Sequence, residues 1–411
     1  MTLLGLFPRN RVPAGQAARR RTSLAWSLAL VLPMLQSSRA RGEAHLDYRY
    51  ELYQEDDDRI EVQTHSALFE TQLKERLLSV KGEVIYDSIS GATPTGAAPS
   101  SKYNYDFMSV YGFQPEIVGN TNGTAAPLTH MEDERKAMSL ETPLTLGRHT
   151  ITPQFAYSEE SDYKSTGVAL NYAVLLNEKN TTLSFGWAHT WDEVLDDHRQ
   201  PQDKRSDDLL IGLNQLLGPK TVLGLHLTYG KASGYLNDPY RLIVAANDLQ
   251  INADDPSGYV EHRPDEREKY IARLSLTQFI TPCHASFEAA YRYFQDSYGT
   301  DAHTIEFWWH QKIGRHVVIS PVLRYYHQTA ADFYYDILPD SNNLPSYYSS
   351  DYRLSEMQTV TAGVNVMIKA TKWLTFDASY RRYVMEGLDG VTAQSAYPSA
   401  NVFSIGARFF F

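Results

Sequence analysis

The last nine residues constrain the fold more than any other stretch, because apolar and polar side chains alternate strictly along them. One row is apolar and consists of Phe403, Ile405, Ala407, Phe409 and Phe411. The opposite row, within residues 404–408, holds a serine, a glycine and an arginine. This alternation predicts a β-strand with one apolar face. A transmembrane β-barrel could use it as the closing strand, with the apolar row toward lipid. The alternative is a buried edge strand of a soluble sandwich.

The aromatic carboxy-terminus also resembles the signal by which bacterial outer-membrane barrels are recognised for assembly. The residues that carry this resemblance are Phe403, Ile405, Phe409 and Phe411. It implies outer-membrane lipid and the barrel assembly machinery as partners.

Composition agrees with a membrane protein that crosses with strands. The chain of 411 residues is 43% hydrophobic, but no apolar run reaches the roughly 18 residues that a membrane helix needs. Its 28 tyrosines outnumber its 16 phenylalanines, which suits belts at a membrane interface. The formal charge of −11 argues against a nucleic-acid partner. The one cysteine, Cys283, excludes a disulfide framework and a haem attachment motif, and we expect no cofactor.

The amino-terminus has the form of a secretory signal peptide. Three arginines at 19–21 precede an apolar run at 24–35, and small residues follow at Ser38 and Ala40. We therefore predict a cleaved signal peptide over residues 1–40 and one barrel domain over residues 41–411, located in the cell outer membrane.

Period-two stretches recur along the rest of the chain, and the connections between them alternate in length. We predict about 16 strands of roughly ten residues, with seven tight turns on one side and eight mostly longer loops on the other. The predicted long connections are 88–133, 192–206, 231–268, 329–355 and 384–400. The predicted fold is an all-β, transmembrane, antiparallel up-and-down barrel with short periplasmic turns and long outer loops.

Charged residues fall on the polar rows of these strands, where a wet lumen would accommodate them. The residues expected to point inward are Asp47, Arg49, Glu51, Lys81, Glu83, Arg273, Glu288, Arg292, Glu306, Lys312, Arg324, Asp377 and Arg381. A barrel of about 16 strands is wide enough for an aqueous channel. The charges would then line a pore, or alternatively brace a narrow or closed lumen as ion pairs. The scattered histidines show no short ligand spacing, so no metal site is predicted.

A rim-located hydrolase is a further alternative. It would require a nucleophile, a base and an orienting group near the outer rim. His189 and His327 lie near predicted strand ends, and Asp207 and Asp208 form an acidic pair, but no nucleophile motif surrounds them. We therefore expect no enzymatic activity.

Two stretches, Tyr86–Pro94 and Arg324–Tyr334, carry a family resemblance. With residues 296–299 and 303–304, they resemble an uncharacterised family of bacterial outer-membrane β-barrel proteins. The sequence departs from the family pattern at His327 and in the 231–268 loop. Members tend to be encoded near small lipoproteins, thioredoxin-like proteins and flavin-transferring enzymes, which implies periplasmic redox or lipoprotein partners.

These observations leave two main hypotheses for function. The first is a channel or conduit for small solutes. The second is a scaffold that seats partner proteins of an exported redox or flavin-linked electron-transfer system. We also hypothesise that the two family stretches fold inward and pack together at the mouth, with Asp87, Asp332 and Arg324 as polar contacts.

Overall fold

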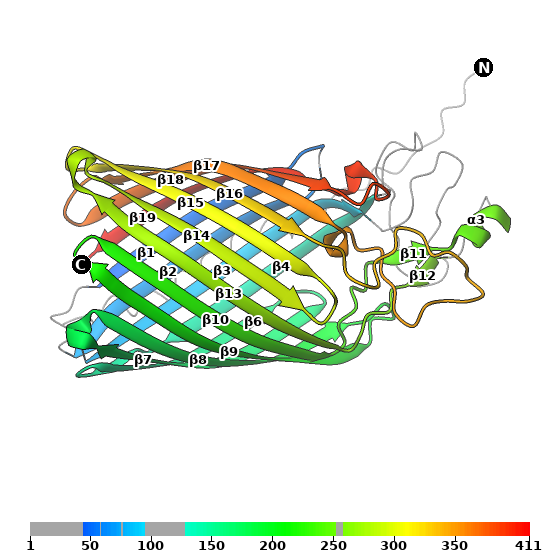
Figure 1. The fold of residues 1–411 in the computed structure, drawn as a ribbon, viewed down its shortest axis with the longest axis horizontal. Helices are drawn as coiled ribbons and strands as arrows, with labels where there is room; N and C mark the ends of the chain where they lie inside the picture. The colour runs from blue at the N-terminus through cyan, green and yellow to red at the C-terminus, as the bar shows by residue number, and fades with distance from the viewer. Residues whose placement is uncertain (1–43, 58, 75–76, 95–127, 252–257) are drawn as a thin grey trace, which may run out of the picture.

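The computed structural model describes residues 44–57, 59–74, 77–94, 128–251 and 258–411, which form a closed antiparallel β-barrel (Figure 1). Its sheet closes where β1 (His45–Glu55) pairs with β19 (Ser399–Phe410). β4 (Leu128–Glu141) and β5 (Leu144–Leu146) both pair with β6 (His149–Glu159), so they count as one wall strand and the wall has 16. The predicted fold class and strand number are therefore confirmed. The predicted signal peptide lies outside the described residues.

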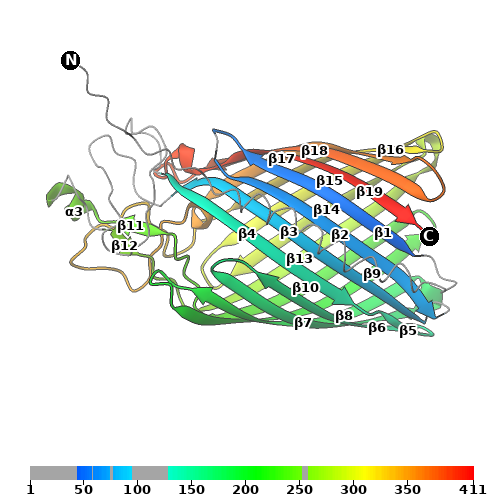
Figure 2. The same cartoon turned by 180° about the vertical axis from the view of Figure 1, so that it is seen from behind.

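The remaining wall strands follow in chain order around the barrel (Figure 2). They are β2 (Glu61–Lys74), β3 (Leu78–Pro94), β7 (Tyr163–Leu176), β8 (Thr181–Leu195), β9 (Pro201–Gly218), β10 (Thr221–Gly234), β13 (Glu266–Ile280), β14 (Ala285–Asp296), β15 (Asp301–Ile313), β16 (Val317–Gln328), β17 (Met357–Lys369) and β18 (Leu374–Gly387). No helix in the described part of the chain is long and apolar enough to cross a membrane.

The two ends of the barrel differ in their connections. We call the end that carries the tight turns and Phe411 the turn end, and the opposite end the loop end. Among the described residues, the long connections at the loop end are 235–251 with 258–265, 329–356 and 388–398, whereas residues 95–127 lie outside the described part of the chain. The connection 235–265 contains β11 (Leu242–Val244), α3 (Ala246–Ile251) and β12 (Gly258–Val260), which extend beyond the barrel (Figure 1). In an outer-membrane barrel the turn end faces the periplasm.

Two predicted loops were drawn too long. The predicted loop 192–206 is wrong, because β8 continues to Leu195 and β9 begins at Pro201. The predicted loop 88–133 is likewise shorter, since β3 continues to Pro94 and β4 begins at Leu128. Strand ends that project beyond the membrane are wet on both faces, so the apolar alternation that marks a strand disappears there.

The outer surface of the wall is apolar with aromatic side chains. Phe403 and Ile405 are 46% and 61% exposed, so the carboxy-terminal row lies outside the barrel rather than in a dry core. This excludes the soluble-sandwich alternative. Exposed aromatic side chains on the same outer face include Trp187, Trp191, Tyr270, Tyr291, Tyr325 and Tyr380.

Candidate functional site: the lumen wall and the roof

Ion pairs in the lumen lie along the wall. The carboxylate of Asp47 receives two hydrogen bonds from Arg408, at 2.7 and 2.6 Å. Other lumen-facing pairs join Arg49 to Asp377 (3.1 Å), Lys81 to Glu141 (3.4 Å) and Arg273 to Glu288 (3.1 Å). Within the described residues, no wall ion pair joins strands further apart than next but one. These pairs therefore run along the wall and do not span the lumen.

The Arg49–Asp377 pair depends on a glycine. The register places Gly406 of β19 between Arg49 of β1 and Asp377 of β18. A Cβ atom at Gly406 would lie 2.6 Å from Oδ1 of Asp377, closer than real Cβ contacts. Gly406 therefore leaves the gap through which this pair forms over β19.

Three lumen arginines have a different environment. Arg292, Arg324 and Arg381 form no ion pair with any described residue. The guanidinium of Arg381 lies 5.7 Å from the ring centroid of Trp308, and that of Arg292 lies 5.4 Å from that of Phe294. These contacts are within the range of cation–π attraction.

Two other sequence candidates also lie on the lumen side. Glu83 shares its face with Lys81, since Gly82 between them pairs with the outward Leu140, which is 44% exposed. Glu306 pairs with Arg324 in the register and accepts a hydrogen bond from Trp308 Nε1 at 3.0 Å.

The hypothesis that Asp87, Asp332 and Arg324 make contacts between the two family stretches is wrong. Asp87 is buried and accepts a hydrogen bond from Nε of Arg135 on the adjacent strand at 2.6 Å. Asp332 is exposed, and its carboxylate lies beside Gly299, where a Cβ atom would collide with it. Arg324 faces the lumen from β16, several residues short of the loop that holds Asp332. Within the described residues, the three side chains therefore make no contact with one another across the mouth.

Two long connections form a structure across the loop end that we call the roof, comprising residues 235–251, 258–265 and 329–356. Arg241 donates a hydrogen bond to the carbonyl oxygen of Pro94, at the end of β3. The part of the roof that holds Arg241 begins after β10, and β10 lies six strands along the wall of 16 from β3. Tyr240 donates a hydrogen bond to Asp162, between β6 and β7. The roof therefore connects distant parts of the rim.

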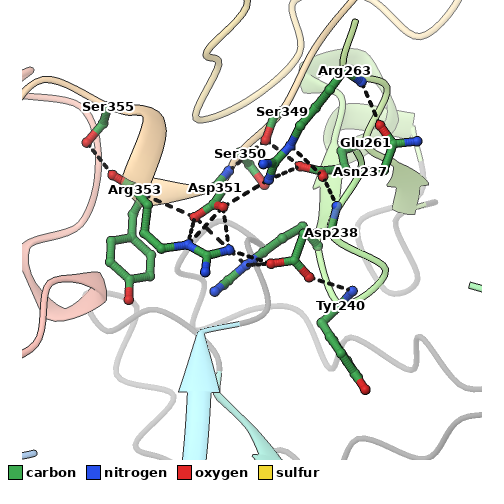
Figure 3. A network of polar contacts seen from close by, with 12 residues as sticks. Asn237, Asp238, Tyr240, Glu261, Arg263, Ser349, Ser350, Asp351, Arg353 and Ser355 are labelled. Carbon is green, nitrogen blue, oxygen red and sulfur yellow. Dashed lines mark hydrogen bonds and ion pairs between the residues drawn. The ribbon is translucent and has the colours of Figure 1, made fainter. Parts of the chain in front are cut away.

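The centre of the roof is a set of buried ion pairs, the Asp351 cluster, which consists of Asp238, Arg241, Glu261, Arg263, Asp351 and Arg353 (Figure 3). Asp351 is 1% exposed. It accepts hydrogen bonds from Nε (2.8 and 2.9 Å) and Nη2 (2.6 Å) of Arg353, and from Nη2 of Arg263 at 2.9 Å. Arg353 also pairs with Asp238, so the cluster joins the two connections that make up the roof.

Two acids of this cluster, Asp351 and Glu261, have pKa values shifted in opposite directions. Burial alone would raise the pKa of Asp351, but Arg353, Arg241 and Arg263 outweigh it and hold the pKa well below its usual range. For Glu261, burial dominates and raises the pKa despite the adjacent Arg263. Asp351 is therefore the fixed negative charge around which the arginines assemble.

An apolar group completes the roof. Ile243, Ala245 and Leu338 are fully buried and pack with Tyr348. Leu338 N–H donates to the carbonyl oxygen of Val244 at 2.9 Å, and so adds a backbone link between the two connections. The roof therefore has a small core of its own, separate from the barrel wall.

Three carboxylates at the rim could supply metal ligands. Oxygen atoms of Asp133, Glu160 and Asp162 lie within 4.8 Å of one another, and all three residues are half-buried. Burial and the neighbouring Asp133 raise the pKa of Glu160. Asp162 already accepts a hydrogen bond from Tyr240 of the roof, and Asp133 accepts one from Ser161 N–H at 3.2 Å. The grouping has the oxygen chemistry of a hard-cation site, but its oxygens are partly used by the protein.

Of the residues considered for a hydrolase, His189 and Asp207 lie on the outer face, whereas Asp208 lies on the lumen face. His189 Nδ1 and Asp207 Oδ1 are 2.8 Å apart, and Trp187 Nε1 also donates to that oxygen at 3.3 Å. His189 packs against Trp191, so the pair belongs to an aromatic belt. In the part of the chain that the structure describes, no hydroxyl or thiol group hydrogen bonds to His189.

Sequence reasoning missed the Asp351 cluster. Its members come from two connections, and Asp238 and Arg353 are separated by 115 positions. The available signal was the concentration of arginine and acidic residues within two loops that also contain apolar residues. That mixture differs from a purely solvated loop.

Comparisons with known proteins bear on family and fold. A family described as "Protein of unknown function (DUF3570)" matches residues 23–201 and 195–401. The chain belongs to this family. No curated protein matches.

Several solved structures are similar to this DUF3570 chain at low sequence identity. CdiB from Acinetobacter baumannii has a TM-score of 0.49 at 9% identity, covering 89% of this chain and 60% of that chain. A bacterial polysaccharide outer membrane secretin has a TM-score of 0.46 at 9% identity, covering 90% and 98%. The siderophore receptor PirA from Acinetobacter baumannii has a TM-score of 0.41 at 10% identity, covering 85% and 54%. The chain thus spans less than two thirds of the CdiB and PirA chains.

Proposed function

We propose that this protein is an outer-membrane conduit for small polar solutes, restricted at its loop end by the roof. The observation that carries the proposal is the arrangement of charge in the lumen, where the paired side chains lie along the wall. A wall of 16 strands is of the size that leaves an aqueous channel in porins. Charges of both signs on the lumen face keep this space hydrated, whereas the outer face is apolar.

The roof gives the conduit a restriction that depends on conformation. Its buried ion pairs and separate apolar core hold two connections together over the barrel end. Movement of the roof would alter access to the lumen without changing the wall pairing. The conduit therefore has a fixed wall and a separable restriction.

Reconstitution of the full chain in planar bilayers tests the proposal. We expect stepwise conductance, and swelling of proteoliposomes in small uncharged sugars. The variant Asp351→Asn, which removes the central charge of the roof, should conduct more than the wild type. If neither protein gives conductance steps or swelling while both remain folded as barrels, the conduit proposal is rejected.

A second candidate is a scaffold that seats partner proteins, including the redox or lipoprotein partners implied by the family resemblance. The observation favouring a scaffold is the roof, whose β11–β12 sheet and α3 extend beyond the wall and offer a structured surface to a partner at the loop end (Figure 1). The periplasmic redox or lipoprotein partners would instead bind at the turn end. A folded but non-conducting barrel that co-purifies with one defined flavin- or haem-bearing protein would support this role over the conduit.

A further inference from the structure

Lumen arginines fall into two groups that differ in their partners. Arg49, Arg273 and Arg408 each pair with a carboxylate at 2.6 to 3.1 Å. Arg292 of β14, Arg324 of β16 and Arg381 of β18 form no such pair with a described residue, and we call these three the arginine arc. An unpaired guanidinium in a lumen retains its planar set of hydrogen-bond donors.

The strand register places the arc at one height in the barrel. Paired residues shift toward the loop end as strand number rises: a line from Tyr48, near the start of β1, reaches Glu266 at the loop end of β13. This shift is the consequence of strand tilt. An arc at constant height must therefore step back toward the turn end from one strand to the next.

The three arginines take this step. In the strand register Arg292 lies opposite Thr304, and Thr304 lies opposite Tyr326. Tyr326 lies two residues beyond Arg324 toward the loop end. In the same way Arg324 lies opposite Thr361, and Thr361 lies opposite Tyr383. Tyr383 lies two residues beyond Arg381 toward the loop end. Each step offsets the tilt, so the three guanidinium groups share a level on one side of the lumen.

Neighbouring groups position the arc. A Cβ atom at Gly363 of β17 would lie 2.7 Å from Cγ of Arg381, so this glycine makes room for the side chain whose guanidinium lies 5.7 Å from the ring centroid of Trp308. A cation–π contact of this kind uses none of the guanidinium N–H groups as hydrogen-bond donors to a protein oxygen. Glu306 also faces the lumen beside Arg324, so the arc with Glu306 carries a net charge of +2.

The far side of the lumen has the opposite charge. Glu83 of β3 and Asp208 of β9 face inward there, as their register with lumen-facing partners indicates, and neither forms an ion pair with a described residue. An anion in the lumen is therefore repelled from one side and attracted to the other. Low-dielectric walls concentrate such a field inside a lumen.

From this arrangement we infer that the arginine arc is an oxyanion-binding site, which takes the carboxylate or phosphate group of a small solute within the lumen. Planar guanidinium groups match both groups in geometry, and charge-assisted hydrogen bonds supply the affinity. This inference rests on the proposed conduit function and specifies the class of solute that the conduit favours.

Inorganic phosphate is the test probe, added to the full-length barrel in planar bilayers bathed in potassium chloride. We expect phosphate to reduce the chloride current with saturation. The triple variant Arg292→Gln, Arg324→Gln, Arg381→Gln should raise the half-blocking phosphate concentration by about tenfold, because charge-assisted hydrogen bonds are lost. Measurements in the Asp351→Asn background provide current if the wild type conducts little.

The matched control is the triple variant Arg49→Gln, Arg273→Gln, Arg408→Gln, which removes the same number of lumen charges and leaves the arc intact. It should keep the wild-type response to phosphate. Equal loss of response in both triple variants, or a conducting wild type that phosphate does not affect, overturns the inference and leaves the conduit function standing. Absence of conductance in every folded variant rejects the conduit function and this inference together.

Discussion

The Asp351 cluster allows the role of the roof to be tested with one atom-sized change. Asp351→Asn keeps the size of the side chain and removes its charge. Three arginines then lie within 4.0 Å of a neutral amide. The side chains of two of them, Arg241 and Arg263, are only 5% and 11% exposed. Removing one partner of a buried ion pair costs about 3–5 kcal/mol. Arg353 is half-exposed and keeps its pair with Asp238, so we expect a cost at the lower end of this range, about 3 kcal/mol. This cost would shift the equilibrium between the closed and the open roof about 150-fold toward the open state.

Two assays measure this shift. Open probability in planar bilayers should rise steeply in Asp351→Asn, and trypsin should cleave the roof faster after Arg241, which is buried in the cluster and is followed by Leu242. The control is Asp340→Asn in the same connection, because among the described residues the Asp340 carboxylate accepts hydrogen bonds only from the backbone and side-chain N–H groups of Asn342, at 2.9 and 3.1 Å. Heat-dependent migration on gels reports whether the wall remains folded. Conductance and proteolysis that are the same in Asp351→Asn and Asp340→Asn would refute the reasoning.

Two further predictions concern pH and assembly. Burial and Asp389 raise the pKa of Asp336 to about 6. The folded loop end therefore binds this proton more tightly than the unfolded chain does. The folded loop end is accordingly stabilised as pH falls through about 6 and destabilised as pH rises through it. Open probability should accordingly be lower at pH 5 than at pH 7 in the wild type, and Asp336→Asn should reduce that difference. Phe411 is 62% exposed, so its deletion should leave refolding in detergent unchanged but lower the amount of barrel assembled in cells, whereas Phe410→Ala should not. Equal assembly of both variants in cells would contradict a recognition role for Phe411.

The wall could be predicted from sequence because each strand contacts two different solvents. Lipid on one face and water on the other impose the same two-residue period on β1 as on β19, and no long-range information is needed to detect it. The same reasoning placed Lys81 and Glu83 on the lumen face. It failed at residues 192–206, where both faces are wet and the period carries no apolar signal.

Pairing and the roof could not be predicted in this way. The partner of Asp87 is Arg135 because the register of β3 and β4 places them opposite each other, and sequence periodicity gives faces but not register. The Asp351 cluster requires the three-dimensional path of two connections, 235–265 and 329–356. Their composition indicates loops, and only the structure shows that they bury charges together.

Salt concentration should separate the contributions of the wall and the roof. The arginine arc is exposed to the lumen, and the Debye length falls from about 10 Å at 0.1 M salt to about 3 Å at 1 M, so phosphate binding there should weaken strongly over this range. Asp351 and its contact with Arg263 are largely shielded from solvent, and buried pairs are screened much less. The open probability that the roof sets should therefore change little between the same two conditions. A protein in which both quantities fall together with salt would have its restriction in the lumen charges, and the roof would then be a surface structure without a part in permeation.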